Sequence, residues 1–226
     1  MHMSWEHLAF LHWRGDADSI CRQLPEGLEL DCFDGSAWLG VVPFLMNRVR
    51  GRWLPEIPPT NSFLELNVRT YVVCDGKPGV WFFSLDAASR LAVWGARTFF
   101  HLPYFNAEMK ASFEARVEYR SRRTHQGEAT GAFEADYEPT GEPFCSKTGT
   151  LEHWLTERYC LYAADESGQL GRGDVQHEPW PLQPARVEIK KNTLGDLPGL
   201  KLKGEPESVL FARRLDVLGW NLESCF

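Results

Sequence analysis

Residues 63–73 constrain the fold of this chain more than any other segment. Polar side chains occupy every second position there: Glu65, Asn67, Arg69 and Tyr71. Side chains alternate between the two faces of a β-strand, so these four share one face and the mostly apolar residues between them share the other. In an open antiparallel sheet such a polar row faces solvent. In a closed barrel it lines the interior.

The strand that follows favours the interior position. Residues 74–79 contain two glycines and a proline and predict a turn, and residues 80–86 form a strand that is largely apolar on both faces. Such a strand is covered on both sides, so pairing with it brings the polar row close to a buried environment. We also take Ser84, near the end of this strand, as a candidate ligand-binding residue.

A helix is predicted over residues 87–100. Its apolar residues recur near helical spacing: Leu91, Trp94, Ala96 and Phe99. Pro103 ends the helix, and Asp86 is the expected N-cap, because a carboxylate accepts hydrogen bonds from the first free N–H groups. Arg97 and His101 lie one turn apart and face the same side.

The polar residues of this region each leave two roles open. Arg69 either pairs with Glu65 or another carboxylate, or binds the carboxylate of a ligand through its planar guanidinium. His101 either carries a proton near neutral pH or caps the end of the helix. Tyr104 either donates a hydrogen bond to a ligand oxygen or seals the core.

Several motifs resemble those of the YqjF-like family of uncharacterised bacterial proteins. They are ELNVRTYV, GVWFFSLDA, the Ala96-Arg97 pair before an aromatic run, LPYF, LTERYCLY and ARRLDVLGW. Together they cover nearly the whole chain. The resemblance implies a mainly β fold with minor α, in which residues 1–226 form one domain. That domain is expected to be a strongly curved, cone-like antiparallel β-barrel of the acetoacetate decarboxylase-like type around a small-molecule cavity.

The chain departs from the decarboxylases at one point of this resemblance. In those enzymes a strand glutamate is followed by an arginine, an aromatic-proline pair and two lysines, and the first lysine forms a Schiff base with a β-keto acid. Glu65, Arg97 and Pro103 align with the glutamate, the arginine and the proline, and Thr98 replaces the acidic partner of the arginine. Tyr104 and Phe105 stand where the lysines should be. Neither supplies the amine that a Schiff base requires, so the resemblance implies the cavity without this chemistry.

The composition of the chain and the spacing of its cysteines argue against several classes of partner and site. The net charge is −7 and no basic stripe is present, so neither nucleic acid nor a membrane is an expected partner. The chain has no signal-peptide pattern and no membrane-spanning stretch, which predicts a cytoplasmic protein. The six cysteines lack CxxC spacing and are expected to be reduced. No metal site or cofactor is predicted.

Other segments complete the expected sheet. Residues 4–14 are predicted as an edge strand, and residues 28–33 and 36–50 as a hairpin over Asp34-Gly35 with a bend at Pro43. Further strands are predicted at residues 111–123, 128–138, 157–164, 169–177 and 208–220. Residues 185–194 are either extended or helical.

Two functions remain open at this point. The first is a small-molecule-binding barrel that acts on or senses a small carboxylate or carbonyl compound, with ligand-binding residues Glu65, Asn67, Arg69, Ser84, Arg97, His101 and Tyr104. The second is a structural or regulatory interaction protein whose cavity is filled by Phe82, Tyr104 and Phe105. A void on the order of a few hundred Å³ separates the two. No catalytic residue is assigned.

Two surface features are also left open. Residues 51–62, with three prolines, form either a lid over the cavity or a rigid surface connector. Long edge strands in such a barrel could pair between subunits, so a homo-oligomer is compatible with the sequence.

Overall fold

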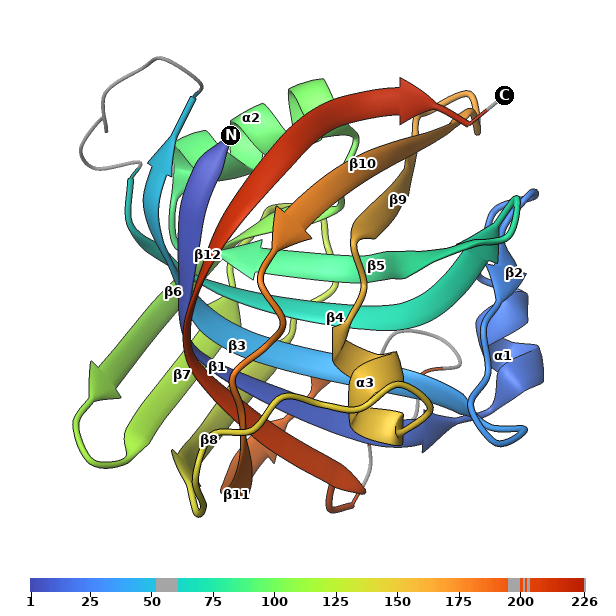
Figure 1. Ribbon diagram of the computed structural model, residues 1–226. Helices are drawn as coiled ribbons and strands as arrows, with labels where there is room; N and C mark the ends of the chain where they lie inside the picture. Colours follow the sequence, from blue (N-terminus) through green and yellow to red (C-terminus); the bar gives the residue numbers. More distant parts are fainter. Residues whose placement is uncertain (52–60, 195–199, 201, 203, 226) are drawn as a thin grey trace.

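The computed structural model describes residues 1–51, 61–194, 200, 202 and 204–225. Twelve strands of this part of the chain belong to one curved sheet, accompanied by three helices (Figure 1). The elements are β1 (His2–Gly15), α1 (Ala17–Cys21), β2 (Glu29–Leu30), β3 (Ala37–Arg50), β4 (Phe63–Cys74), β5 (Lys77–Ala87), α2 (Arg90–Phe100), β6 (Tyr104–Phe113), β7 (Val117–Arg123), β8 (Ala132–Pro139), α3 (Leu151–Thr156), β9 (Cys160–Ala164), β10 (Leu170–His177), β11 (Leu182–Asn192) and β12 (Ser208–Ser224).

The sheet curves until it meets itself. Its strand order is β10-β9-β5-β6-β7-β8-β11-β12-β1-β3-β4-β2, and β10 also pairs with β12 while β5 also pairs with β4. A closed circuit of paired strands therefore runs through β5, β4, β3, β1, β12, β10 and β9, which we call the cavity ring. A second circuit shares β5, β4, β3, β1 and β12 with the cavity ring and closes on the other side through β11, β8, β7 and β6. The predicted curved, mainly antiparallel fold is confirmed, although the short β5–β6 and β5–β9 pairings are parallel.

Strands β1, β3 and β4 are buried on both faces because they belong to both circuits. One face packs against β7 and β8 in an apolar core that includes Leu11, Leu39, Leu66, Tyr119 and Phe133. The other face looks into the cavity ring. The alternation in β4 follows from this arrangement: its apolar positions enter the core and its polar positions enter the ring.

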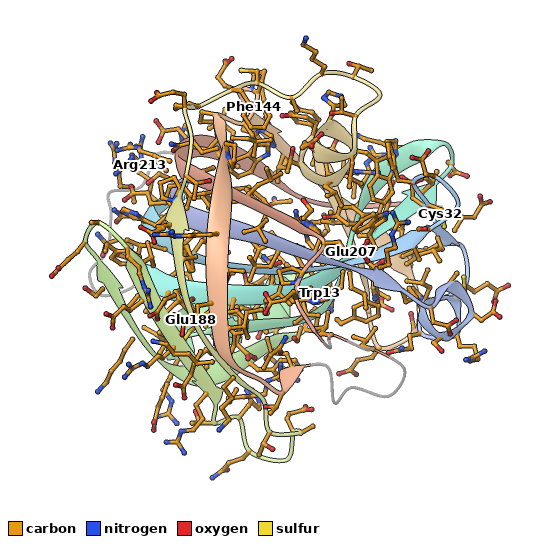
Figure 2. All side chains as sticks on the ribbon, turned by 90° about the horizontal axis from the view of Figure 1, so that it is seen from below. Trp13, Cys32, Phe144, Glu188, Glu207 and Arg213 are labelled. Atoms are coloured by element: carbon orange, nitrogen blue, oxygen red, sulfur yellow. The ribbon has the colours of Figure 1, made fainter. Side chains whose placement is uncertain are left out.

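The outer strands have one wet face, as predicted. Exposure alternates residue by residue along β7, and Figure 2 shows Glu188 among the side chains on this side of the molecule. The guanidinium of Arg116 contacts Glu188 at 3.1 Å and also reaches the buried Asp136. None of the helices within the described residues is long and apolar enough to cross a membrane.

The predicted strand over residues 111–123 is two strands, because β6 ends at Phe113 and pairs with β7, which begins at Val117. Two further strand predictions were wrong because closure of the sheet is not visible locally. β1 is not an edge strand, since it pairs with β3 on one side and β12 on the other. Asp34 and Gly35 do form a tight turn, with φ of 48° and 71°. The short β2 that precedes this turn pairs with β4, however, not with β3.

Pro43 lies where the sheet departs from regular pairing. The β1–β3 register shifts between Glu6, which pairs with Leu45, and Leu11, which pairs with Val41. Pro43 falls inside this interval and has no β1 partner, so its missing N–H costs no hydrogen bond to that strand. The sequence predicted an irregularity at this proline, and the register shift is that irregularity.

The segment around α2 differs from the prediction at its start. β5 continues to Ala87, so Asp86 is still in the sheet and does not cap the helix. The N-cap is Ser89, whose side chain accepts a hydrogen bond from the backbone N–H of Ala92. Asp86 instead accepts a hydrogen bond of 2.7 Å from Nε of the buried Arg123.

The structure answers one of two questions that the sequence left open about local structure. Residues 185–194 fall largely within β11, so this segment is extended. The proposed lid or connector at residues 51–62 lies mostly outside the described residues, which exclude 52–60.

Candidate functional site

The cavity ring encloses a void of about 460 Å³. Every strand of the ring contributes side chains to its wall, and α2 lies at the end where the N-terminus and the second half of β12 also lie (Figure 1). Phe82 and Tyr104 line the void without filling it, and Phe105 packs outside it against the guanidinium of Arg123, 4.3 Å from its ring centre. A cavity of this size is typical of a small-molecule site.

Three polar residues of β4 enter the void together. Glu65, Asn67 and Arg69 all line it, as the alternation predicts. They are held by the two strands beside β4: Glu65 pairs with Phe44 of β3, and Arg69 pairs with Phe82 of β5. These strand pairings hold the backbone of β4 so that all three polar side chains face the void.

Glu65 is tied to the neighbouring strands through both its side chain and its backbone. Its Oε2 accepts a hydrogen bond of 2.8 Å from the hydroxyl of Tyr104, which begins β6. Its backbone oxygen accepts a second bond of 2.7 Å from the hydroxyl of Tyr119 on β7. Only 2% of Glu65 is exposed, so its carboxyl lies in a fixed, nearly dry position.

Burial sets the protonation of this pair. Desolvation raises the pKa of Glu65 from 4.5 to about 8, and the hydrogen bond from Tyr104 opposes this only in part. The pKa of Tyr104 is raised well above 10 by burial and by the adjacent Glu65. Both groups are therefore mainly protonated at neutral pH, and Glu65 titrates within reach of physiological conditions.

Arg69 carries a charge that no carboxylate of the described chain neutralises. One Nη2 hydrogen bond reaches the backbone oxygen of Leu155 at 3.3 Å, and its buried Nε has no partner. Nearby on the same strand face, Oδ1 of Asn67 is also buried and unpartnered. Buried polar groups without partners are costly, so this part of the cavity wall has hydrogen-bonding capacity that the described protein atoms do not use.

Arg158 is a second arginine in the wall, and sequence reasoning did not nominate it. Its Nη1 contacts Asp31 at 2.7 Å and its Nε donates to the backbone oxygen of Trp154 at 2.7 Å, while Nη2 has no partner. Asp31 balances its charge, so Arg158 offers a free donor but no net charge. It lies in the LTERYCLY motif, a signal that was available but was read only as a family feature.

The guanidinium groups of Arg69 and Arg158 both lie close to the aromatic ring of Tyr71. The guanidinium carbon of Arg69 lies 5.6 Å from the ring centre of Tyr71, and that of Arg158 lies 5.1 Å from it. The Tyr71 hydroxyl lies 2.6 Å from Nε2 of His12. Burial lowers the pKa of His12 well below its usual value, with a smaller contribution from Arg69, so this histidine is neutral and supports the tyrosine.

Three predicted site residues do not line the void. Ser84 is turned away because the β4–β5 register shifts: Val68 pairs with Ser84, but Arg69 pairs with Phe82, leaving Phe83 as an extra residue. Such a bulge reverses the faces of all residues beyond it. Leu85 consequently lines the void in the position that regular alternation assigns to Ser84.

Arg97 and His101 lie at the far end of α2, outside the wall. Nη1 of Arg97 donates a hydrogen bond of 3.0 Å to the backbone oxygen of Tyr104, so it anchors the residue that contacts Glu65. His101 is exposed and is the C-cap of α2, with φ of 49°. The cap that the structure shows is made by the backbone N–H of His101, which bonds to the backbone oxygen of Ala96, and the two roles of its side chain stay predictions.

No group of three or more His, Cys, Asp or Glu side chains in this part of the chain could hold a metal ion. No lysine of the described chain lines the void. Lys77 pairs with Asp174 at 2.9 Å, and Lys110 and Lys147 are exposed.

Comparison with solved structures confirms the predicted fold type. The chain is similar to an acetoacetate decarboxylase from Legionella pneumophila, with a TM-score of 0.62 and 14% identity over 99% of this chain and 87% of that one. It is also similar to MppR, an enduracididine biosynthesis enzyme in complex with pyruvate, with a TM-score of 0.64 and 13% identity over 100% and 90% of the two chains. At these identities the similarity shows the fold alone.

Sequence comparison identifies the family. The chain is 45% identical to the uncharacterized protein YqjF of Bacillus subtilis (strain 168) over 223 residues, which are 98% of this chain and 91% of that protein. Residues 2–216 match the model of DUF2071, a family described as an uncharacterized conserved protein. The chain therefore belongs to the DUF2071 family, to which the sequence motifs pointed, and has an acetoacetate decarboxylase-like fold.

Proposed function

We propose that this protein binds a small carboxylate or carbonyl compound in the cavity and does so without forming a Schiff base. The observation that carries the proposal is the guanidinium of Arg69, which pairs with no described carboxylate and lies on the same strand face as the protonated Glu65 in a void of about 460 Å³. A cation in a cavity wall without a carboxylate partner is the feature that a bound carboxylate would satisfy.

The donors around Arg69 suit a carboxylate. A guanidinium offers parallel N–H groups that match the two oxygens of a carboxylate. The free Nη2 of Arg158 adds another donor near the same aromatic ring. MppR, which shares this fold, forms a complex with pyruvate, and this supports a small carboxylate as the kind of ligand for the cavity.

If the protein transforms the bound compound, Glu65 is the group that would act as general acid or base. With a pKa of about 8 it is poised between the acid and the base near neutral pH, where a general acid–base catalyst is most effective. It could donate its proton to a carbonyl oxygen of the ligand, or, once ionised, accept one from a neighbouring carbon. The Tyr104 hydroxyl keeps the carboxyl in place throughout.

Native mass spectrometry of freshly purified protein tests the binding proposal. We expect a mass above that of the bare chain that disappears under denaturing conditions. Arg69→Ala should lose it, whereas Arg120→Ala, an exposed arginine on β7, should keep it. A ligand that Arg69→Ala retains in full would contradict the proposed carboxylate site.

Borohydride reduction tests the absence of amine chemistry. Treatment with acetoacetate and borohydride should leave the mass of the protein unchanged, because the described lysines lie outside the wall. A reduced adduct mapped to Lys110 or Lys147 would show that a lysine reaches the ligand and would overturn this part of the proposal.

A further inference from the structure

We propose that the ligand is an amphipathic monocarboxylate, with its carboxylate at Arg69 and an extended apolar chain or ring running from there to the mouth of the cavity beside α2. This inference rests on the proposed function, because it takes the carboxylate position as given and assigns the remainder of the void.

Polarity is distributed unevenly along the void. The partnerless polar atoms in the wall are those of Asn67, Arg69, Arg158 and Trp5. Arg69 and Arg158 both bond to backbone oxygens of α3, at the other end of the ring from α2 (Figure 1). The surrounding strands present apolar side chains: Leu8, Phe10, Val42, Phe44, Val80 and Phe82. A ligand that satisfies both regions has one polar end and a long apolar remainder.

The polar residues of β10 do not form a second binding end. Asp174 lines the void, but its carboxylate is occupied by Lys77 at 2.9 Å and by Arg172 at 3.0 Å. Nδ1 of His177 lies 2.8 Å from the backbone oxygen of Glu178. The ring of His177 stacks on the ring of Tyr159, so both its polar edge and one of its faces are already in contact with the protein.

Large apolar side chains at the mouth are exposed, and they lie in the same wall as one exposed cation, Arg50. Leu91 and Phe99 of α2 line the void, yet they are 60% and 63% exposed. Trp220 of β12, also in the wall, is 48% exposed. Large apolar side chains at the rim of a cavity mark a surface that gains from contact with an apolar partner, and these three are continuous with the apolar wall inside.

The size of the void also favours a ligand with a long apolar part. A keto acid of three or four carbons would occupy only the region of Arg69 and leave most of the 460 Å³ in contact with apolar walls. Apolar cavities bind apolar groups in preference to water. A chain or ring that fills the space therefore gains affinity that a short acid does not.

A chain-length series tests this inference by isothermal titration calorimetry on the full chain. The probes are butyrate, hexanoate, octanoate and decanoate. The expected result is binding that tightens roughly fourfold for each added methylene, the factor that corresponds to burying a methylene from water. Sebacate, which adds a second carboxylate to the chain of decanoate, should bind more weakly than decanoate because this carboxylate would lie among the apolar side chains of Leu91, Phe99 and Trp220, while the exposed Arg50 stays in water.

A matched pair of α2 variants locates the apolar end. Leu91→Ser should weaken decanoate by roughly five- to tenfold and leave butyrate unchanged. Trp94→Ser is the control, because Trp94 is as exposed as Leu91 but does not line the void. Thermal unfolding of both variants checks that they remain folded.

The outcomes separate this inference from the proposed function. If all four acids bind equally and Arg69→Ala weakens each of them, the carboxylate site stands and the amphipathic ligand is wrong. If no acid binds at any length, both are wrong. Tighter binding of sebacate than of decanoate overturns the monocarboxylate assignment, as does an equal loss of decanoate in Leu91→Ser and Trp94→Ser.

Discussion

The hydroxyl of Tyr104 on β6 donates a hydrogen bond of 2.8 Å to the carboxyl of Glu65 on β4, inside the cavity ring. The two residues are joined across strands that are not neighbours in the sheet. The cavity thus holds a neutral acid beside a neutral phenol, and the raised pKa of this acid governs how the stability of the protein should respond to pH.

Glu65→Gln should remove a pH dependence of stability. The pKa of Glu65 is about 8 in the folded chain and near 4.5 when unfolded. Between these values the folded state holds a proton that the unfolded state has lost, so rising pH favours unfolding by up to about 1.4 kcal/mol per pH unit. This contribution is fully favourable below pH 4.5 and is lost as pH passes 8. Urea unfolding from pH 5 to 9 measures it.

The comparison between variants isolates the contribution of Glu65. The free energy of unfolding of Glu65→Gln relative to wild type should rise from pH 5 to pH 9, because glutamine cannot ionise. Glu118→Gln removes an exposed carboxylate on β7 and should show no such trend. A difference between Glu65→Gln and wild type that stays constant over this range would mean that the carboxyl titrates normally.

Tyr104→Phe should raise the pKa of Glu65 further. The phenol stabilises the ionised carboxylate by donating a hydrogen bond, and this contribution opposes the effect of burial. Its loss should also cost about 1 kcal/mol of stability near pH 6. Infrared titration of the protonated carboxyl band, assigned with Glu65→Gln, reads the midpoint. A midpoint at or below that of wild type would contradict the role assigned to the phenol.

The sequence was informative where the chain obeys a simple period. Glu65, Asn67 and Arg69 were placed on one face by alternation alone, and they do line the void. Regular alternation failed for Ser84, because the extra residue Phe83 reverses the faces of β5. A bulge of one residue leaves no mark in a segment that is apolar on both sides, so no local pattern could have revealed it.

Residues that come from distant segments could not be predicted in the same way. Arg158 enters the wall only because the segment between α3 and β9 lies beside the cavity, and its pairing with Asp31 joins positions far apart in sequence. Closure of the cavity ring through β10–β12 and β5–β9 is similarly non-local. Arg97 was correctly associated with this region, but its guanidinium binds the backbone of Tyr104 instead of facing the void.

Tyr71→Phe should lower the free energy of unfolding of the protein. The substitution leaves Nε2 of the fully buried His12 without its partner, and Nδ1 of this ring already has none. An unsatisfied buried polar group costs about 1–3 kcal/mol. Adding His12→Leu should recover part of this loss, because the double variant removes the unpartnered group. Urea unfolding of the two single variants and the double variant measures the coupling, and strictly additive losses would contradict it.

Gly79→Ala should separate two strands of the cavity ring. A Cβ at this position on β5 would lie 2.7 Å from Sγ of Cys160 and 2.9 Å from its backbone oxygen on β9. The backbone atom cannot move aside without breaking the β5–β9 pairing, so we expect a loss of about 1–3 kcal/mol in the free energy of unfolding. Gly95→Ala in α2 is the matched control, because nothing lies within 4 Å of the added methyl group. Alanine favours the helix there and should stabilise the protein by about 0.5–1 kcal/mol. Equal stability of the two variants would show that β9 does not approach β5 as closely as the structure has it.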